Sequence, residues 1–242
     1  MRKTGWFLAV AAIFSIPAVA TTVADPWNPG NPNDEMNLYE IYNAVYGTDF
    51  TSTNGATGPS STGGMDDLLV PEIGVFFGEG AVVEFEARYA GYTQRFGYYT
   101  DPDGTPVLTP LFDVIAGVHL PGDTGAPDPA LIDGSAFPIG FYDNAPIGGS
   151  NTWMSQDFRN SDGLDHMVAF WATNEDGSTS TNTFIIAFED RRNLGDVDYN
   201  DLVVEVTVRG TPTFTPPVPE PASAALLLIG LSGLALRRRF QA

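Results

Sequence analysis

Cysteine is absent from this chain of 242 residues, lysine occurs once and histidine twice. The lack of cysteine excludes disulfide bonds, thiolate metal sites and a cysteine nucleophile. The G-x-S-x-G, H-E-x-x-H and phosphate-binding glycine motifs of common enzymes are absent as well. His119 lies in the apolar run VIAGVHL, where we expect a core or edge position rather than a catalytic base. This poor supply of bases and nucleophiles predicts that the protein is not an enzyme.

Positive charge is also scarce, since 11 lysine and arginine residues face 30 acidic ones, for a formal net charge of −19. Removing the two terminal signals described below leaves 6 basic and 29 acidic residues, a charge near −23. Such a surface repels nucleic acid and anionic lipid, so neither is expected as a partner of the exported body. It favours solubility outside the cell and attracts divalent cations.

Residues 1–20, MRKTGWFLAVAAIFSIPAVA, have the three parts of a secretory signal peptide. Arg2 and Lys3 give a basic start, an apolar run follows, and Ala18-Val19-Ala20 provides the small residues that a signal peptidase requires. A permanent N-terminal anchor is the alternative, but the apolar run is short for a membrane span. We therefore expect signal peptidase as a partner and export as the outcome.

The C-terminal segment, residues 218–242, begins with the motif Val218, Pro219, Glu220, Pro221. An apolar run follows, and the segment closes on Arg237, Arg238, Arg239, the pattern of a stop-transfer element. The arrangement resembles the PEP-CTERM sorting signal of Gram-negative bacteria. This resemblance implies transient membrane insertion of the C-terminal helix, cleavage near the motif by an exosortase, and a secreted or outer-surface location. A permanent anchor remains the alternative.

The body between the two signals reads as one all-β domain preceded by a loop-rich segment. Residues 21–67 are expected to be extended or loop, with a short helix at 38–46, and residues 210–217 to be a Pro/Thr linker. Within 68–209, strand patterns separated by Gly, Asp and Pro turns favour a β-sandwich or jelly roll. We expect strands at residues 81–89, 95–99, 111–120, 137–142, 167–172, 183–188 and 202–208.

An acidic stretch, EDRRNLGDVDYND, joins the last two predicted strands. Like charges this close repel one another unless a cation holds them. Calcium takes six to eight oxygen ligands, which carboxylates and an amide supply. An EF-hand is excluded, because Asp201 stands where that loop needs glycine and Thr207 where it needs glutamate. We therefore predict a Ca²⁺ site of another kind; its predicted ligands are Glu189, Asp190, Asp196, Asp198, Asn200 and Asp201. A merely solvated acidic turn is the alternative.

The closing residues also carry a family resemblance. FxxxFED at 184–190, GDVDYNDLVVEV at 195–206 and the upstream DGLDHMVAF at 162–170 are similar to a bacterial extracellular β-domain known only as a domain of unknown function. The resemblance implies a non-catalytic, calcium-binding module in secreted or surface-attached proteins. Arg191 and Arg192 occupy an insert that is often glycine-rich in that family.

Together these features predict an exported, calcium-binding surface or extracellular-matrix protein associated with exopolysaccharide. A calcium-dependent lectin is the alternative from another class, because Tyr92, Tyr98 and Tyr99 lie near a predicted loop and aromatic rings stack on sugars. Core packing is the simpler interpretation of these tyrosines. A glycan-active enzyme is the third possibility, although a carboxylate pair can always be chosen from so many acids.

Overall fold

The computed structural model describes residues 35–53, 64–65, 68–70, 74–149, 151–210 and 212–215. The predicted signal peptide, 1–20, and the predicted sorting signal, 218–242, lie outside these residues. Within the described ranges, no helix combines the length and apolar character that a membrane crossing requires.

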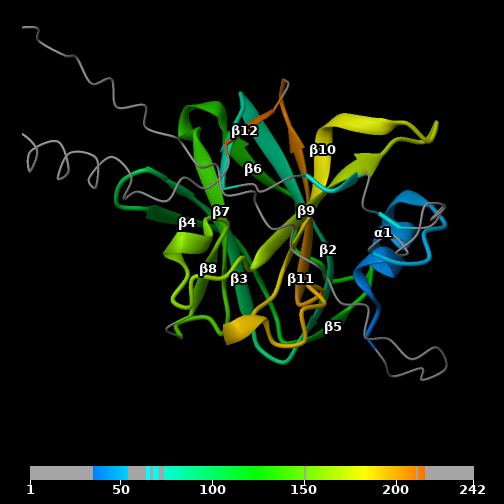
Figure 1. Ribbon diagram of the computed structural model, residues 1–242, viewed down its shortest axis with the longest axis horizontal. Coiled ribbons are helices and arrows are strands. Elements are labelled where there is room, and N and C mark those ends of the chain that lie inside the picture. The colour runs from blue at the N-terminus through cyan, green and yellow to red at the C-terminus, as the bar shows by residue number, and fades with distance from the viewer. Residues whose placement is uncertain are drawn as a thin grey trace, which may run out of the picture.

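Two antiparallel sheets form the described body, as the all-β prediction required (Figure 1). One sheet has the order β12-β1-β7-β3-β4, with β8 paired to β7, and the other has the order β5-β2-β11-β10-β9, with β6 paired to β2. In chain order the elements are α1 (Leu38–Tyr46), β1 (Val75–Phe77), β2 (Gly80–Ala90), β3 (Gln94–Thr100), β4 (Val107–Val114), β5 (Gly117–His119), β6 (Ala130–Asp133), β7 (Ile139–Asn144), β8 (Thr152–Met154), β9 (Met167–Thr173), β10 (Thr179–Phe188), β11 (Leu202–Val208) and β12 (Thr213–Thr215).

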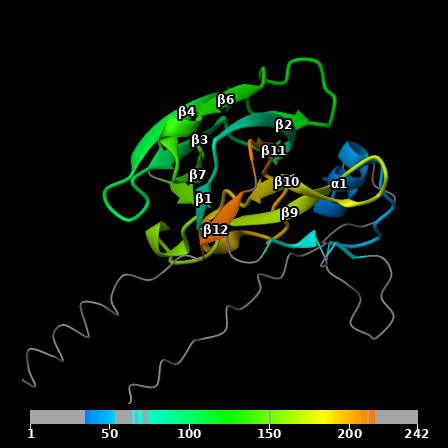
Figure 2. The ribbon, with the colours of Figure 1, turned by 90° about the horizontal axis from the view of Figure 1, so that it is seen from above.

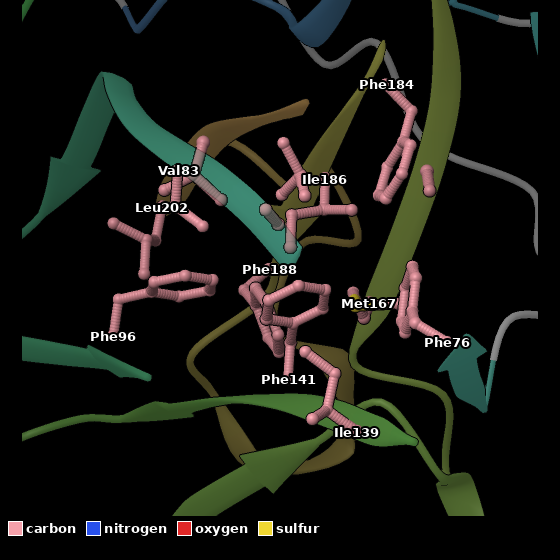
Figure 3. Close-up of a cluster of buried hydrophobic side chains, with 14 of the residues drawn as sticks. Phe76, Val83, Phe96, Ile139, Phe141, Met167, Phe184, Ile186, Phe188 and Leu202 are labelled. Carbon is pink, nitrogen blue, oxygen red and sulfur yellow. The ribbon is translucent and has the colours of Figure 1, made fainter. Parts of the chain in front are cut away.

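The main core lies between the two sheets. Phe76, Phe96 and Phe141 from one sheet meet Phe184 and Phe188 from the other, and all five side chains are buried (Figure 3). Their rings pack in stacked and edge-on pairs with centroids 4.7–6.2 Å apart. Burying a phenylalanine side chain contributes about 1.5–3 kcal/mol, so this cluster is a principal source of stability.

The outer face of the sheet that contains β10 is covered by α1 (Figure 2). Leu38, Ile41 and Tyr42 of the helix pack against Ile185 and Ala187 of β10 and their neighbours. The helix begins where the Glu40 carboxylate accepts a hydrogen bond from the Asn37 backbone N–H at 2.9 Å, and it ends at Gly47, whose φ of 67° suits glycine. The predicted helix at 38–46 is therefore confirmed.

A bulge in β2 changes which side chains face the core. Phe85 pairs with Val204 and Ala87 with Val203, so Glu86 is an extra residue in the strand. Val83 and Phe85 consequently face the sandwich interior, whereas Ala87 packs in the outer cluster under α1. A regular alternation along residues 81–89, which would put Val83, Phe85, Ala87 and Tyr89 on one face and Glu84, Glu86 and Arg88 on the other, therefore fails after Glu86. Arg88, which that alternation places with the exposed Glu84, is instead fully buried.

Four other differences separate the observed elements from the predicted ones. Strand β7 begins at Ile139 rather than 137, because Pro138 has no N–H to donate to a ladder. The predicted strand at 111–120 is interrupted between β4 and β5. Residues 213–215, inside the predicted linker 210–217, form β12 and pair with β1, so the linker prediction is wrong there. Strands β1, β6 and β8 were not predicted, since runs of three or four residues are too short to show alternation.

Candidate metal centre

The candidate site lies in the connection between β10 and β11, at the lower end of the sandwich in Figure 1. These strands are antiparallel neighbours, and Phe188 pairs with Leu202 at their ends. The next residues outward, Glu189 and Asp201, are therefore brought together by strand register alone. The 13-residue connection from Glu189 to Asp201 carries five carboxylates.

An inner group consists of Glu189, Asp190 and Asp201. Each offers a carboxylate oxygen, and the three oxygens lie within 4.8 Å of one another. The Asp190 backbone N–H donates to Asp201 Oδ2 at 2.8 Å, which fixes one side of that carboxylate. Glu189 is fully buried, and its Oε2 has no hydrogen-bond donor among the described residues. An anionic oxygen in that position costs free energy until a cation or a proton joins it.

An outer group consists of Glu35, Asp196 and Asp198, whose oxygens also lie within 4.8 Å of one another. Glu35 reaches the loop from the segment before α1, because the Asn200 side-chain amide donates to the Met36 carbonyl at 3.0 Å. That hydrogen bond orients Asn200, which is only 2% exposed, and leaves its Oδ1 without a donor in the described part of the chain.

The loop backbone is strained around these carboxylates. Asn193, Leu194, Val197 and Tyr199 all have φ between 54° and 67°, a region that residues with a Cβ rarely adopt. Each such residue costs of order 1–3 kcal/mol and persists only where its surroundings fix it. At Gly195 a side chain would be strained, because φ is 43° and a Cβ would lie 2.5 Å from Glu189 Oε1. The loop is therefore built closely around the Glu189 carboxylate.

The two groups open on one cavity of about 190 Å³. Its acidic lining combines members of both groups: Glu35, Asp190, Asp196 and Asp201. The remaining lining residues come from the end of β2, the following turn and the loop itself: Tyr89, Gly91, Tyr92 and Arg191. Arg191 is the guanidinium among them, and the carboxylate of Asp196 raises its pKa. In the absence of a bound ion, this arginine is the cavity's own counter-charge.

Three of the carboxyl groups have pKa values far above their ordinary ranges. Burial raises the pKa of Glu189 to about 8, and the charges of Asp198 and Asp196 add to the effect. Burial, together with the neighbouring Asp190 and Glu189, raises the pKa of Asp201 to about 10. The pKa of Asp198 rises to about 7 through burial and the charge of Asp196. The metal-free site therefore holds protons where a cation would otherwise neutralise the charge.

A pair of stacked, buried rings supports the loop from the protein interior. The indole N–H of Trp153 donates to the Asp190 carbonyl at 2.6 Å, and His166 Nδ1 lies 2.8 Å from the Glu189 carbonyl. His166 Nε2 lies 3.1 Å from Asp162 Oδ2, and Asp162 also accepts from the Asn193 backbone N–H at 2.8 Å. Both ring nitrogens of the buried His166 are thus engaged in holding the loop.

A buried polar network lies behind the inner group. The Gln94 side-chain amide donates to Asp143 Oδ2 and to Asp190 Oδ2, each at 3.2 Å. Gln94 Oε1 in turn accepts from Arg88 Nε at 2.5 Å. Burial and the charge of Asp190 raise the pKa of Asp143 well above its usual range. Because the bulge at Glu86 turns Arg88 inward, a positive charge stands behind the carboxylates.

The structure divides the predicted ligands instead of joining them at one centre. Glu189, Asp190 and Asp201 form the inner group, Asp196 and Asp198 belong to the outer group, and Asn200 lies beside the latter. Val197 and Tyr199 face away from the carboxylates and pack in or against the outer cluster under α1. Sequence reasoning missed Glu35, which is far from the loop in the chain, and the supporting residues Gln94 and Asp143. The predicted sorting residues, from Val218 to Arg239, lie outside the described residues.

Comparisons with known proteins agree with the two resemblances seen in the sequence. Residues 135–209 match the family model described as a domain of unknown function (DUF4114), and residues 217–239 match the PEP-CTERM protein-sorting motif. No curated protein matches the chain. Among solved structures, the C-terminal domain of the BC2L-C lectin from Burkholderia cenocepacia is 16% identical; the match covers 57% of this chain and 90% of that one, with a TM-score of 0.28.

Proposed function

We propose that this protein is a non-catalytic, calcium-binding component of the cell surface or extracellular matrix. The matched sorting motif implies export through an exosortase and a destination in the cell envelope or at the surface. The DUF4114 match extends over β7 to β11, and so includes the loop that carries five of the acids. The proposal concerns what this loop does once the protein is exported.

The observation that carries the proposal is the Glu189 carboxylate. It is fully buried, lies beside two further carboxylates, and keeps one oxygen without a donor in the described residues. Proteins satisfy buried polar atoms almost without exception, so an orphan anionic oxygen points to a missing partner. A cation bound by the three carboxylates would satisfy the oxygen and relieve the repulsion together.

The donor chemistry favours calcium among the common cations. All predicted ligands are carboxylate or amide oxygens, and the chain has no cysteine. Zinc, copper and iron favour nitrogen or sulfur, whereas hard cations favour oxygen. The irregular loop offers many oxygens, and calcium accepts irregular geometry with six to eight ligands, whereas magnesium requires a near-ideal octahedron.

The surroundings of the histidines support a non-catalytic role. His166 is fully buried between Trp153 and the loop, and both its nitrogens face protein acceptors. His119 Nε2 lies 3.2 Å from the Ile115 carbonyl. A general base must reach a substrate proton, and the buried His166, whose two nitrogens face protein acceptors, is not arranged to do so.

Association with extracellular polysaccharide follows from the proposed location, and Tyr92 favours a more specific variant. Its side chain is 44% exposed and lines the same cavity as Glu35, Asp190 and Asp196, whereas Tyr99 is fully buried in the core. An exposed aromatic ring beside a calcium ion is able to stack on a sugar whose hydroxyls ligate the ion. A calcium-dependent lectin is therefore the second candidate.

Isothermal titration calorimetry of the purified chain, stripped of metal by a chelator, tests the proposal. We expect saturable calcium binding, together with a rise in the melting temperature in millimolar calcium. Binding of acidic or neutral polysaccharides that disappears with chelator, and that weakens on Tyr92→Ala, would favour the lectin. If calcium causes neither heat nor a shift in melting temperature, the proposal fails.

A further inference from the structure

We infer that the site holds two calcium ions rather than one, and that the second position takes Glu35 from the segment before α1 as a ligand. The inference rests on the proposed calcium binding and adds the number of ions, the ligand sets and a structural role. Glu35 precedes α1 and is far from the acidic loop in the sequence, so it reaches the loop only when the chain is folded.

The two acidic groups have separate memberships. Glu189, Asp190 and Asp201 form one set and Glu35, Asp196 and Asp198 the other, with no shared residue, and each set is compact enough to surround one ion. A single ion bound in the inner set would leave three carboxylates of the outer set close together. Arg191, which lines the cavity, would then offset these carboxylates with one positive charge against three negative ones.

Each group also has its own buried oxygen without a donor among the described residues. For the inner group it is Glu189 Oε2, since Glu189 Oε1 accepts from the Arg191 backbone N–H at 3.4 Å. For the outer group it is Asn200 Oδ1. The Asn200 side-chain amide donates to the Met36 carbonyl, and the Asn200 backbone N–H donates to Asp198 Oδ1 at 3.4 Å. These two hydrogen bonds hold Asn200 beside the outer group, which contains Asp198. Each acidic group thus has an unsatisfied buried oxygen beside it, which indicates an absent partner in each group.

The burial of the ligands sets the expected order of binding. Glu189 and Asp190 are buried, whereas Glu35 and Asp196 are exposed at the cavity. Charges interact more strongly where water is excluded, so the inner ion should bind more tightly and exchange more slowly. The outer ion is expected to be the exchangeable one.

The outer ion would also fasten one part of the fold to another. Glu35 and Met36 lead into α1, which covers the outer face of β10 and β11. In the metal-free protein, the hydrogen bond from Asn200 to the Met36 carbonyl is a contact that ties this segment to the loop. A cation bridging Glu35 to Asp196 and Asp198 would make the attachment of α1 dependent on calcium.

Calcium titration of the purified chain and of Glu35→Gln tests the inference. Glu35 is exposed, so its substitution should leave the fold intact, and Glu175→Gln is the matched control because Glu175 is an exposed acid in the turn at 174–177. We expect about two ions per chain for the parent and the control, and about one for Glu35→Gln with the tighter site unchanged. Anomalous diffraction from crystals grown with calcium should show two peaks, one in each group.

The possible results separate this inference from the proposed function. One ion per chain in the parent, unchanged by Glu35→Gln, would leave calcium binding intact and overturn the second site. No bound calcium in any variant would overturn both. Two ions that both survive Glu35→Gln, with no anomalous peak beside residue 35, would reject Glu35 as a ligand.

Discussion

The rings of Trp153 and His166 stack 3.7 Å apart with an angle of only 7° between their planes. Each ring contacts one of two successive backbone carbonyls, with Trp153 on Asp190 and His166 on Glu189. The aromatic pair therefore fixes the backbone from which the inner carboxylates project, although neither ring is itself an oxygen ligand.

Replacing Trp153 by phenylalanine keeps a buried ring but removes the N–H that donates to Asp190. A buried carbonyl left without its donor costs about 1–3 kcal/mol, so the melting temperature should fall. Calcium affinity should also fall, because the inner carboxylates lose part of their support. Trp171→Phe, which alters a half-buried ring packed on the main core, should lower stability without changing calcium affinity. Equal loss of affinity in both variants would contradict the role assigned to Trp153.

Asp196→Asn should have opposite effects on the two states of the protein. It removes one charge from the outer group, so the metal-free chain should melt at a slightly higher temperature through reduced repulsion. An amide oxygen is a weaker calcium ligand, so the affinity should fall, by about tenfold. Asp128→Asn, at an exposed acid outside both groups, provides the control. Identical melting curves for Asp196→Asn and the parent, with and without calcium, would mean that the carboxylates are merely solvated.

Stability of the metal-free protein should fall as pH rises. Glu189, with a folded pKa of about 8 against an ordinary value of 4.5, binds more protons when folded than when unfolded between those values. The stability that this proton binding adds to the folded state is thus complete below about pH 4.5 and is lost as the pH rises through 8. Asp198 and Asp201 contribute stability in the same way, and it is lost as the pH rises through their folded pKa values of about 7 and about 10.

Calcium should reverse the effect of pH at this site, since the ion displaces the protons and binds better when they are gone. Melting curves at pH 5 to 9, with chelator and with saturating calcium, should therefore diverge as pH increases. Parallel curves across that range would show that the raised carboxyl pKa values are unrelated to calcium.

Substitutions of Arg191 and Arg192 should differ in their effects on calcium affinity and stability, although the two residues are adjacent. Arg191 lines the cavity and faces Asp196, so its guanidinium competes with a bound ion. Arg191→Gln should strengthen calcium binding by about threefold to tenfold and destabilise the metal-free chain. Arg192 is exposed and starts the short 3₁₀ turn, so Arg192→Gln should leave both quantities unchanged. Calorimetry and thermal melting of the two variants distinguish the cases.

Processing at both ends should be visible in the mass of the mature protein. From the two terminal signals we expect a mature chain that starts near residues 20–22 and ends near Pro221. Intact-mass spectrometry of material from the producing cell measures both ends. Recovery of a membrane-bound chain that retains Arg237, Arg238 and Arg239 would support the permanent anchor instead.

Local patterns made much of the fold predictable. Apolar runs bounded by turn residues identified β9, β10 and β11, and the aromatic residues of 38–46, which recur on one face of a helix, identified α1. The crowding of acids between β10 and β11 marked the loop. These features depend on neighbours in the chain, which is the information that a single sequence carries best.

What escaped prediction depends on long-range contacts. Glu35 meets Asp196 and Asp198 across most of the chain, and Gln94 meets Asp143 and Asp190 because three separate segments converge. Such long-range contacts leave no periodic pattern in the sequence. Strand β12 was missed because a Thr-Phe-Thr run between prolines has the composition of a linker until a partner strand is available.

The bulge at Glu86 makes the length of β2 a constraint as strict as the identity of its residues. Inserting one residue between Ala87 and Arg88 would shift Arg88 by one position, turn its side chain outward and place the inserted side chain in the space that the guanidinium occupies. Homologous chains should therefore tolerate substitutions in this stretch more readily than insertions or deletions. An alignment that opens a gap there would separate proteins that share the sandwich from proteins that also retain the buried arginine.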